Sequence, residues 1–421
     1  MTQPTGGDLV ASILKHLDVT RVFAIASIHN LPILGAIHRL GYTKVVDMRH
    51  EQGAVHAADA YARVTGQLGV AIVSTGPGTA NALGGLFEAA FASSRVLLIT
   101  GQVPTKYLQA PRDYIHEAPR QTEMLHTVCR CVRCPESTES LLESLSEVTA
   151  DILSGRLQPG AVVYPIDIQG LPVGAEVLND IETTIRRGLD ARPRMDTPDL
   201  PIERAAALLA NADRPLIWAG GGVASAGGLA LLTVFAERHR IPVVTSREGR
   251  GAIPEDHPLA LGCFPQVEPF RAAIEESDCV LAVGTQFQMY STDSWSLQLP
   301  DDLIHLDIDD SVVGRVYLAS GGNRAMKPSG RKAGPASRTR SPHPPVSGEP
   351  AGVRPARRPV RRPPLRSARR SRRPLRLPGP FASLTRSGVI ARRRRPGRLR
   401  QRRRGRRACG LRRWSGEPDP S

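Results

Sequence analysis

Short apolar runs alternate with helix-like patterns along the first 320 residues of the chain. The runs are rich in β-branched residues, and they predict strands at residues 22–26, 45–47, 70–74, 96–100, 162–167, 216–219, 243–245, 279–283 and 303–307. The segments between them space apolar residues three and four positions apart, as at Val55, Ala58 and Ala62. Buried strands joined by helices form parallel sheets with right-handed crossovers. The pattern therefore predicts an α/β protein with two doubly wound parallel-sheet domains.

The alternation is interrupted at residues 189–201, where several prolines stand in a stretch without periodicity. We interpret this stretch as a linker between the two domains. The first domain is then predicted at residues 1–188 and the second at residues 197–319. Residues 321–421 form a separate segment, because the alternation of strands and helices stops shortly before it.

Charge divides the chain at the same place. The whole chain holds 56 Lys+Arg and 40 Asp+Glu, a net charge of +16. Residues 321–421 hold 31 basic and 3 acidic residues, which leaves 25 basic and 37 acidic residues for the first 320. The basic tail contains one Phe, one Trp and one Ile. So few large apolar residues cannot build a core, and we expect residues 321–421 to be disordered.

Three explanations of the tail remain open. Its commonest residues, Arg, Pro, Gly and Ala, have codons that begin with two G or C bases, so a GC-rich gene read out of frame would give this mixture. We interpret the tail as frameshifted. The alternatives are a native basic arm or fused sequence, and any of the three would bind polyanions through its arginines without specific nucleic-acid recognition.

Other composition features point to an ordinary cytoplasmic protein. The chain has no run of about 18 uncharged apolar residues and no basic-then-apolar start, so we expect neither a membrane span nor a secretory signal. Six unevenly spaced cysteines do not form a disulfide framework. Cys129, Cys131 and Cys134 have the spacing of metal ligands but lack a fourth partner nearby, so we expect isolated thiols and no metal site.

Two neighbouring motifs could carry chemistry. Glu51 follows a predicted strand and precedes an alanine-rich helix predicted at residues 52–65. Ligands of such sheets bind beyond the carboxyl ends of the strands. The alternative for Glu51 is an N-cap carboxylate on its own helix. Residues 74–81, Ser-Thr-Gly-Pro-Gly-Thr-Ala-Asn, predict a strand end, a glycine turn and a helix start, which lets backbone approach a ligand.

Together these motifs resemble the pyrimidine-binding domain of thiamine diphosphate enzymes. The resemblance lies in residues 50–54 (His-Glu-Gln-Gly-Ala), 57–66 and 74–81, and it continues through 100–104 and 166–167. Residues 215–222, 241–245 and 305–309 resemble the central domain of the same enzymes. The acetolactate synthase-like group of decarboxylases and carboligases is the most similar branch.

The resemblance assigns roles to named residues. It implies that Glu51 is the catalytic glutamate, which hydrogen-bonds a ring nitrogen of the cofactor's aminopyrimidine and so promotes formation of the thiazolium ylide. It also implies that Gly76, Pro77, Gly78 and Asn81 line the pyrimidine side of the cofactor. The expected reaction is decarboxylation of a 2-oxo acid with transfer of the product to an acceptor.

Several residues depart from the family pattern. The family usually has a glycine-containing loop after its first strand, whereas residues 24–30 here read Ala-Ile-Ala-Ser-Ile-His-Asn. His29 in that loop, together with His116 and Gln121, are candidate substrate residues. His116 falls near active-site histidines of some members, although a surface-loop histidine is the alternative. Gln121 falls near a glutamine of acetolactate synthases.

The family's diphosphate-binding motif, Gly-Asp-Gly with a later Asn, is absent from this sequence. We therefore expect the chain to provide only the pyrimidine half of the site, with Mg²⁺ held by a domain that it lacks. We do not expect FAD, although Gly220, Gly221 and Gly222 could approach a flavin phosphate. The chain is then a truncated enzyme, inactive alone, that forms a homo-oligomer or pairs with a full-length homologue. The alternatives are a non-catalytic partner subunit and a polyanion-binding protein.

Overall fold

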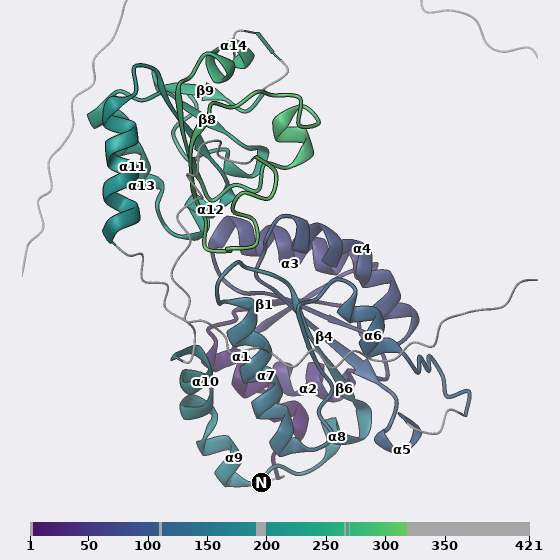
Figure 1. Cartoon of the computed structure of the whole chain (residues 1–421). Helices are drawn as coiled ribbons and strands as arrows, with labels where there is room; N and C mark the ends of the chain where they lie inside the picture. The colour runs from purple at the N-terminus through teal and green to yellow at the C-terminus, as the bar shows by residue number, and fades with distance from the viewer. Residues whose placement is uncertain (1–2, 109–111, 191–198, 265–266, 269, 318–421) are drawn as a thin grey trace, which may run out of the picture. The chain divides into compact units, whose positions relative to one another are not determined.

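A computed structural model of the chain describes residues 3–108, 112–190, 199–264, 267–268 and 270–317. The predicted disorder of residues 321–421 lies outside the described residues. Two parallel sheets with helices packed on them make up the described part, and both sheets fall within one compact unit, Met1–Arg338 (Figure 1). The predicted fold class is confirmed.

The first sheet has six strands in the order β2-β1-β3-β4-β6-β5, all parallel. Their bounds are β1 (Arg21–Ala24), β2 (Lys44–Asp47), β3 (Gly69–Val73), β4 (Val96–Gln102), β5 (Cys131–Arg133) and β6 (Gly160–Pro165). Every residue of β3, β4 and β6 is buried, because helices cover both faces of the sheet.

Two groups of helices cover those faces (Figure 1). The first packs into one apolar cluster and consists of α1 (Gly6–His16), α2 (Leu31–Leu40), α7 (Thr138–Ile152), α8 (Ile166–Gly170) and α10 (Ile181–Asp190). The second packs into another cluster and consists of α3 (Glu51–Thr65), α4 (Pro77–Phe91) and α6 (Gln121–His126). The short helices α5 (Thr105–Leu108) and α9 (Ala175–Asn179) lie in connections.

The second sheet has five parallel strands in the order β11-β10-β7-β8-β9. Their bounds are β7 (Pro215–Ala219), β8 (Val243–Thr245), β9 (Ala260–Gly262), β10 (Cys279–Val283) and β11 (Asp302–Leu306). The accompanying helices are α11 (Asp199–Asn211), α12 (Gly221–Ser225), α13 (Leu229–His239) and α14 (Phe270–Glu275), with 3₁₀ turns η1 (Arg247–Gly249) and η2 (Met289–Thr292). Two apolar clusters, one on each face, bury the sheet.

Three details differ from the sequence predictions. The predicted linker is shorter, because α10 continues to Asp190 and α11 begins at Asp199. The strand predicted at 162–167 ends at Pro165. Asp167 lies in the first turn of α8, where its carboxylate accepts from the Thr105 amide and hydroxyl. The edge strands β5 and β9 were not predicted, since each has three residues and no long apolar run.

None of the helices in the described ranges combines the length and the apolar character needed to cross a membrane.

Candidate functional site

The first sheet has a switch point between β1 and β3. β2 lies on one side of β1 and β3 on the other, so the connections after these two strands run in opposite directions. Ligands of doubly wound sheets bind in the crevice at such a point, beyond the carboxyl ends of the strands. The loop after β1 carries His29, and the turn after β3 carries Gly76. Topology alone therefore brings two of the predicted site segments together.

Glu51 lies in the first turn of α3, with its side chain directed toward α4. The N-cap is His50, whose Nδ1 accepts from the Gln52 amide at 3.2 Å, so the N-cap alternative for Glu51 is wrong. The Glu51 Oε2 accepts from the Asn81 Nδ2 at 3.0 Å. Its Oε1 lies 3.1 Å from the point where a Cβ of Gly78 would stand. The carboxylate thus has one oxygen held by α4 and the other over a position without a side chain.

The turn before α4 is a tightly braced glycine turn. Gly76 has φ +56 and ψ −110, a conformation that disfavours any residue with a Cβ. The Gln121 Oε1 accepts from the Gly76 amide at 2.6 Å and from the Thr75 hydroxyl at 2.7 Å, while its Nε2 donates to the Gly101 carbonyl at 2.9 Å. Pro77 opens the helix, where its missing N–H costs nothing.

The two histidines lie side by side across this turn. His29 is 1% exposed, His116 is exposed, and their ring centroids are 5.8 Å apart. The His116 carbonyl lies 2.2 Å from the point where a Cβ of Gly76 would stand, so the loop holding His116 packs directly on the glycine turn. Burial, and then the neighbouring His116, lower the pKa of His29, with partial opposition from the Ile115 backbone.

The predicted site residues therefore lie together beyond the carboxyl ends of the strands of the first sheet. Glu51, Gly78 and Asn81 form one end of the arrangement, and His29, Gly76, His116 and Gln121 form the other. A carboxylate, a side-chain-free turn and two imidazoles suit a flat heterocycle with a reacting carbonyl compound beside it.

Two family models match parts of this chain. The family model "Thiamine pyrophosphate enzyme, N-terminal TPP binding domain" matches residues 4–124, and "Thiamine pyrophosphate enzyme, central domain" matches residues 202–322. The chain belongs to the thiamine pyrophosphate enzymes. Within that family it is acetolactate synthase-like, as its relatives show.

Three curated relatives illustrate the match. The probable 2-ketoarginine decarboxylase AruI of Pseudomonas aeruginosa is 33% identical over 356 residues, covering 84% of this chain and 61% of its own length. The probable acetolactate synthase large subunit of Methanocaldococcus jannaschii is 31% identical, and the match covers 74% of this chain and 52% of that protein. The acetolactate synthase isozyme 2 large subunit of Escherichia coli is 30% identical, and the match covers 75% of this chain and 56% of that protein. The chain spans about half the length of the curated relatives it matches.

The sequence analysis missed a layer of buried hydroxyl and amide groups beneath the candidate site. The Thr79 and Thr100 hydroxyls lie 2.6 Å apart, and both donate to the Ser74 carbonyl. Asn30 is fully buried; its Oδ1 accepts from the Ser27 amide and its Nδ2 donates to the Ile25 carbonyl. These bonds fix the loops after β1 and β3. The sequence did contain a signal for this layer, because polar residues directly follow the apolar strands. Buried there without water, such residues must form hydrogen bonds within the protein.

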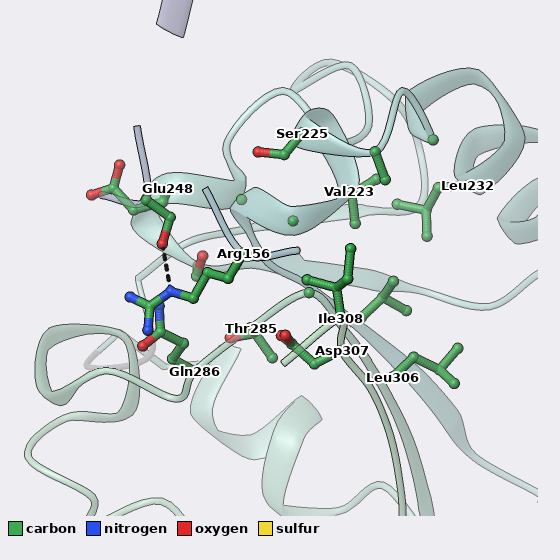
Figure 2. A pocket seen from close by; sticks show the side chains of 18 of the residues that line it. Arg156, Val223, Ser225, Leu232, Glu248, Thr285, Gln286, Leu306, Asp307 and Ile308 are labelled. Carbon is green, nitrogen blue, oxygen red and sulfur yellow. Dashed lines mark hydrogen bonds between the residues drawn. The ribbon is translucent and has the colours of Figure 1, made fainter. Parts of the chain in front are cut away.

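The second sheet has its own switch point, between β7 and β10, and a cavity of about 1100 Å³ lies there. Figure 2 shows polar side chains such as Arg156 and Glu248 at one end and aliphatic ones such as Leu232 and Ile308 at the other. The Arg156 Nε donates to the Ser93 hydroxyl at 2.9 Å. Burial raises the pKa of Asp307, which lines the same cavity.

The glycines of this cavity are explained by chain packing. A Cβ at Gly220 or Gly222 would stand 2.0 or 2.6 Å from the backbone of Gly284, so both loops need glycine to pass each other. They are therefore not evidence for a bound flavin phosphate, and the prediction against FAD stays a prediction.

The three cysteines with metal-ligand spacing are buried or half-buried. Burial raises the pKa of Cys129 to about 12 and that of Cys134 to about 11, which keeps both thiols protonated. No group of three metal-ligating side chains was found among the described residues. Asp307 follows the end of β11, and Asp309 accepts from the Ser311 amide and hydroxyl.

Proposed function

We propose that this chain carries the pyrimidine half of a thiamine diphosphate site that decarboxylates a 2-oxo acid and passes the product to an acceptor. The observation that supports it best is the Glu51 carboxylate, held by Asn81 on one oxygen and free toward the Gly78 turn on the other. When bound, thiamine diphosphate supplies the electron sink that 2-oxo-acid decarboxylation needs.

In this proposal each residue has a physical task. Glu51 shares a proton with a ring nitrogen at its Oε1: the protonated carboxyl group donates it, and the carboxylate accepts the hydrogen bond once the nitrogen holds the proton. Gly76 and Gly78 present backbone without side chains on either side of Pro77, so that a flat ring can lie against the turn. Asn81 keeps the Glu51 carboxylate in one rotamer, which improves the precision of that hydrogen bond.

The substrate side of the proposal uses the other end of the arrangement. His29 and His116 contact the 2-oxo acid, because their rings flank the same turn. Gln121 is 1% exposed and its Oε1 and Nε2 are both bonded to the framework, so bracing the turn is the role we give it. The substrate's identity is not specified by these residues.

The diphosphate and Mg²⁺ contacts belong, in this proposal, to a homologous domain of another chain. Family members place the cofactor between the pyrimidine domain of one subunit and the diphosphate domain of another. The chain would then be inactive alone and would work without FAD. Calorimetric titration of the chain with thiamine diphosphate and Mg²⁺ should show no micromolar binding, and such binding would overturn the half-site proposal.

A subunit-complementation assay tests the function directly. A full-length acetolactate synthase-like homologue is made inactive by replacing its own catalytic glutamate with Gln, and it is co-expressed with this chain. If Glu51 supplies the missing carboxylate, mixed subunits regain 2-oxo-acid turnover. Glu51→Gln in this chain should abolish the gain, and the remote exposed variant Glu176→Gln should keep it. No turnover with the unaltered chain in a proven mixed complex would refute the proposal.

One surface of α4 favours pairing with another subunit. The partner is a second copy of this chain or a complete homologue, and the surface would serve a non-catalytic subunit equally well. Pro77, Ala80, Gly84, Phe87 and Phe91 are exposed at helical spacing and leave an uncharged stripe beside Asn81. If the unaltered chain co-purifies with the homologue, the double variant Phe87→Glu, Phe91→Glu should lose that co-purification. If the unaltered chain self-associates, the same variant should be monomeric. Val64→Glu, an exposed change on α3, is the matched control.

A further inference from the structure

Ser74 carries a buried hydroxyl group without a hydrogen-bond partner. The residue directly follows β3 and is 5% exposed, and its Oγ forms no hydrogen bond within the described part of the chain. Leaving a buried polar group unpaired destabilises a fold, and an alanine in this position would avoid that loss. Native structures keep few such groups, so the serine hydroxyl needs an explanation.

The backbone of Ser74 is fixed, so loose packing does not explain the unpaired hydroxyl. Its carbonyl accepts from the Thr79 hydroxyl at 3.0 Å and from the Thr100 hydroxyl at 2.9 Å. The preceding residue, Val73, is in register with Thr100 between the parallel strands β3 and β4. The side chain keeps its own freedom, because rotation about the Cα–Cβ bond moves the hydroxyl from one rotamer to another without moving the chain.

The Ser74 side chain lies beside the Glu51 carboxyl group. The Ser74 Cβ is 2.8 Å and the Glu51 Oε1 is 3.1 Å from the point where a Cβ of Gly78 would stand. Gly78 has no side chain, so both groups face the same gap. Asn81 donates to the Glu51 Oε2 at 3.0 Å, whereas the Oε1 accepts no hydrogen bond from the described residues. An unpaired hydroxyl and an unpaired carboxyl oxygen therefore meet at this gap.

We propose that Ser74 is a positioning residue for Glu51, and that its hydroxyl donates to the Glu51 Oε1 when the carboxyl group is ionised. The inference deepens the proposed function and rests on it, because that function makes Glu51 the group that shares a proton with the cofactor ring. A carboxylate oxygen can accept two hydrogen bonds, so the Oε1 has room for the hydroxyl and for a ring nitrogen. When Glu51 holds the proton, the hydroxyl turns away into the unpaired orientation that the structure shows.

This bond would decide where the shared proton lies. Hydrogen bonds to the charged form of a carboxyl group favour that form. Ser74 and Asn81 together give the ionised Glu51 two donors in addition to the ring nitrogen. Ser74 therefore helps Glu51 to leave the proton on the ring, which is the task that the proposed function gives to this carboxyl group.

One titratable neighbour of Glu51 has to be separated from this effect. The contacts from α4 and from the turn after β3 are uncharged: Asn81, Gly78 and Ser74. The charged residues between α3 and α4 pair with one another in the later turns of both helices: Asp59, Arg63 and Glu88. The titratable or charged residues just before α3 are exposed: Asp47, Arg49 and His50. Of these three, His50 titrates near neutral pH.

Titration of the Glu51 carboxyl group tests the inference without any ligand. The full chain is labelled with ¹³C at its glutamate carboxyl carbons, and the Glu51 signal is the one that Glu51→Gln removes. Ser74→Ala should move the midpoint of the Glu51 titration up by about one pH unit, the effect of one lost hydrogen bond to a charged group. Ser74→Thr, which keeps the hydroxyl, should return the midpoint to its original value.

Thr149→Val is the matched control. The Thr149 Oγ1 is also buried without a partner, but it lies on α7, which belongs to the other group of helices on the first sheet. This variant should leave the Glu51 midpoint unchanged. The measurement is repeated in a His50→Asn background, which removes the neighbouring titration and keeps a capping side chain. A midpoint that Ser74→Ala does not move, or that moves only while His50 is present, would overturn the inference.

The complementation assay separates this inference from the proposed function. Ser74→Ala should lower the turnover of mixed subunits about tenfold and leave their co-purification intact, because the hydroxyl acts on Glu51 and not on assembly. Complementation with an unmoved Glu51 midpoint would refute the role of Ser74 alone. A moved midpoint without complementation by the unaltered chain would refute the proposed enzyme function alone.

Discussion

Gly76 shows how one residue joins the two ends of the candidate site. Its positive φ lets the chain turn from β3 into α4, and its missing Cβ leaves room for the His116 carbonyl. The next glycine, Gly78, leaves room for Glu51. The carboxylate and the imidazoles therefore depend on the same three-residue turn for their positions.

Gly76→Ala should destabilise the fold strongly. The new Cβ would stand 2.2 Å from a backbone carbonyl and would force a disfavoured conformation, and we expect a loss of about 3 kcal/mol in the free energy of unfolding. Gly41→Ala is the matched control, because Gly41 has φ +69 with nothing within 4 Å. Its strain alone should cost about 1 kcal/mol. Urea unfolding measures both, and equal losses would show that the His116 contact is unimportant.

The buried histidines predict a pH dependence of stability. Burial lowers the pKa of His29 and of His305 below the ordinary 6.5. As pH falls, the unfolded chain therefore gains protons before the folded one does. The free energy of unfolding should have its highest value above about pH 6.5. It should decrease as the pH falls further, until the pH is below the pKa values of the two histidines in the folded state.

Chemical unfolding at a series of pH values between 7 and 5 tests this. His29→Leu should reduce the slope of stability against pH, because it removes one of the two histidines. His56→Leu, an exposed control, should leave the slope unchanged. An unchanged slope in the His29 variant would mean that folding does not lower the pKa of His29.

Sequence alone located the Glu51 end of the site better than the His29 end. Glu51, Gly76, Gly78 and Asn81 stand in short local motifs, so their order along the chain already placed them at neighbouring helix starts. His29 and His116 are 87 positions apart, and only the strand order brings them together. No local pattern could show that His29 would be buried, or that Gln121 would brace the turn with both its Oε1 and its Nε2.

At the scale of elements, apolar periodicity was a sufficient guide where burial is complete. β3 and β4 are apolar because both of their faces are covered, and both were predicted within two residues. β5 and β9 lie at sheet edges, where one side has no strand and the apolar pattern fades. The Cys129–Cys134 segment, where we expected isolated thiols, contributes three residues to the edge strand β5.

Arg63 links α3 to three carboxylates and should matter for stability. Its guanidinium lies 2.7 Å from Asp59, 3.1 Å from Glu88 on α4 and 3.4 Å from Glu248 in η1. The Asp59 side chain is only 6% exposed, so losing its partner leaves a buried charge unpaired. Arg63→Met should therefore lower the free energy of unfolding by about 3 kcal/mol.

Arg250→Met is the matched control for Arg63. Arg250 pairs with Glu255 in water, and exposed pairs add little to stability. Thermal and urea unfolding should therefore find this variant unchanged. If Arg63→Met is equally silent, Asp59 is either solvated or protonated in the folded chain, and the network adds nothing to the packing of α3 against α4.

At the scale of the whole molecule, the charge of the chain makes opposite predictions for its two parts. The first 320 residues have 12 more acids than bases, and residues 321–421 have 28 more bases than acids. A column of immobilised DNA at low salt should retain the full chain and release it as salt rises, because the arginines displace counterions from phosphates. A chain ending at residue 320 should pass through unretained.

Replacing Arg392, Arg393, Arg394 and Arg395 with Gln should reduce the slope of log affinity against log salt by up to about 4. Retention of the acidic part, or a slope unaffected by the four changes, would mean that recognition is built into the folded domains and would contradict the reading of the tail as a composition effect.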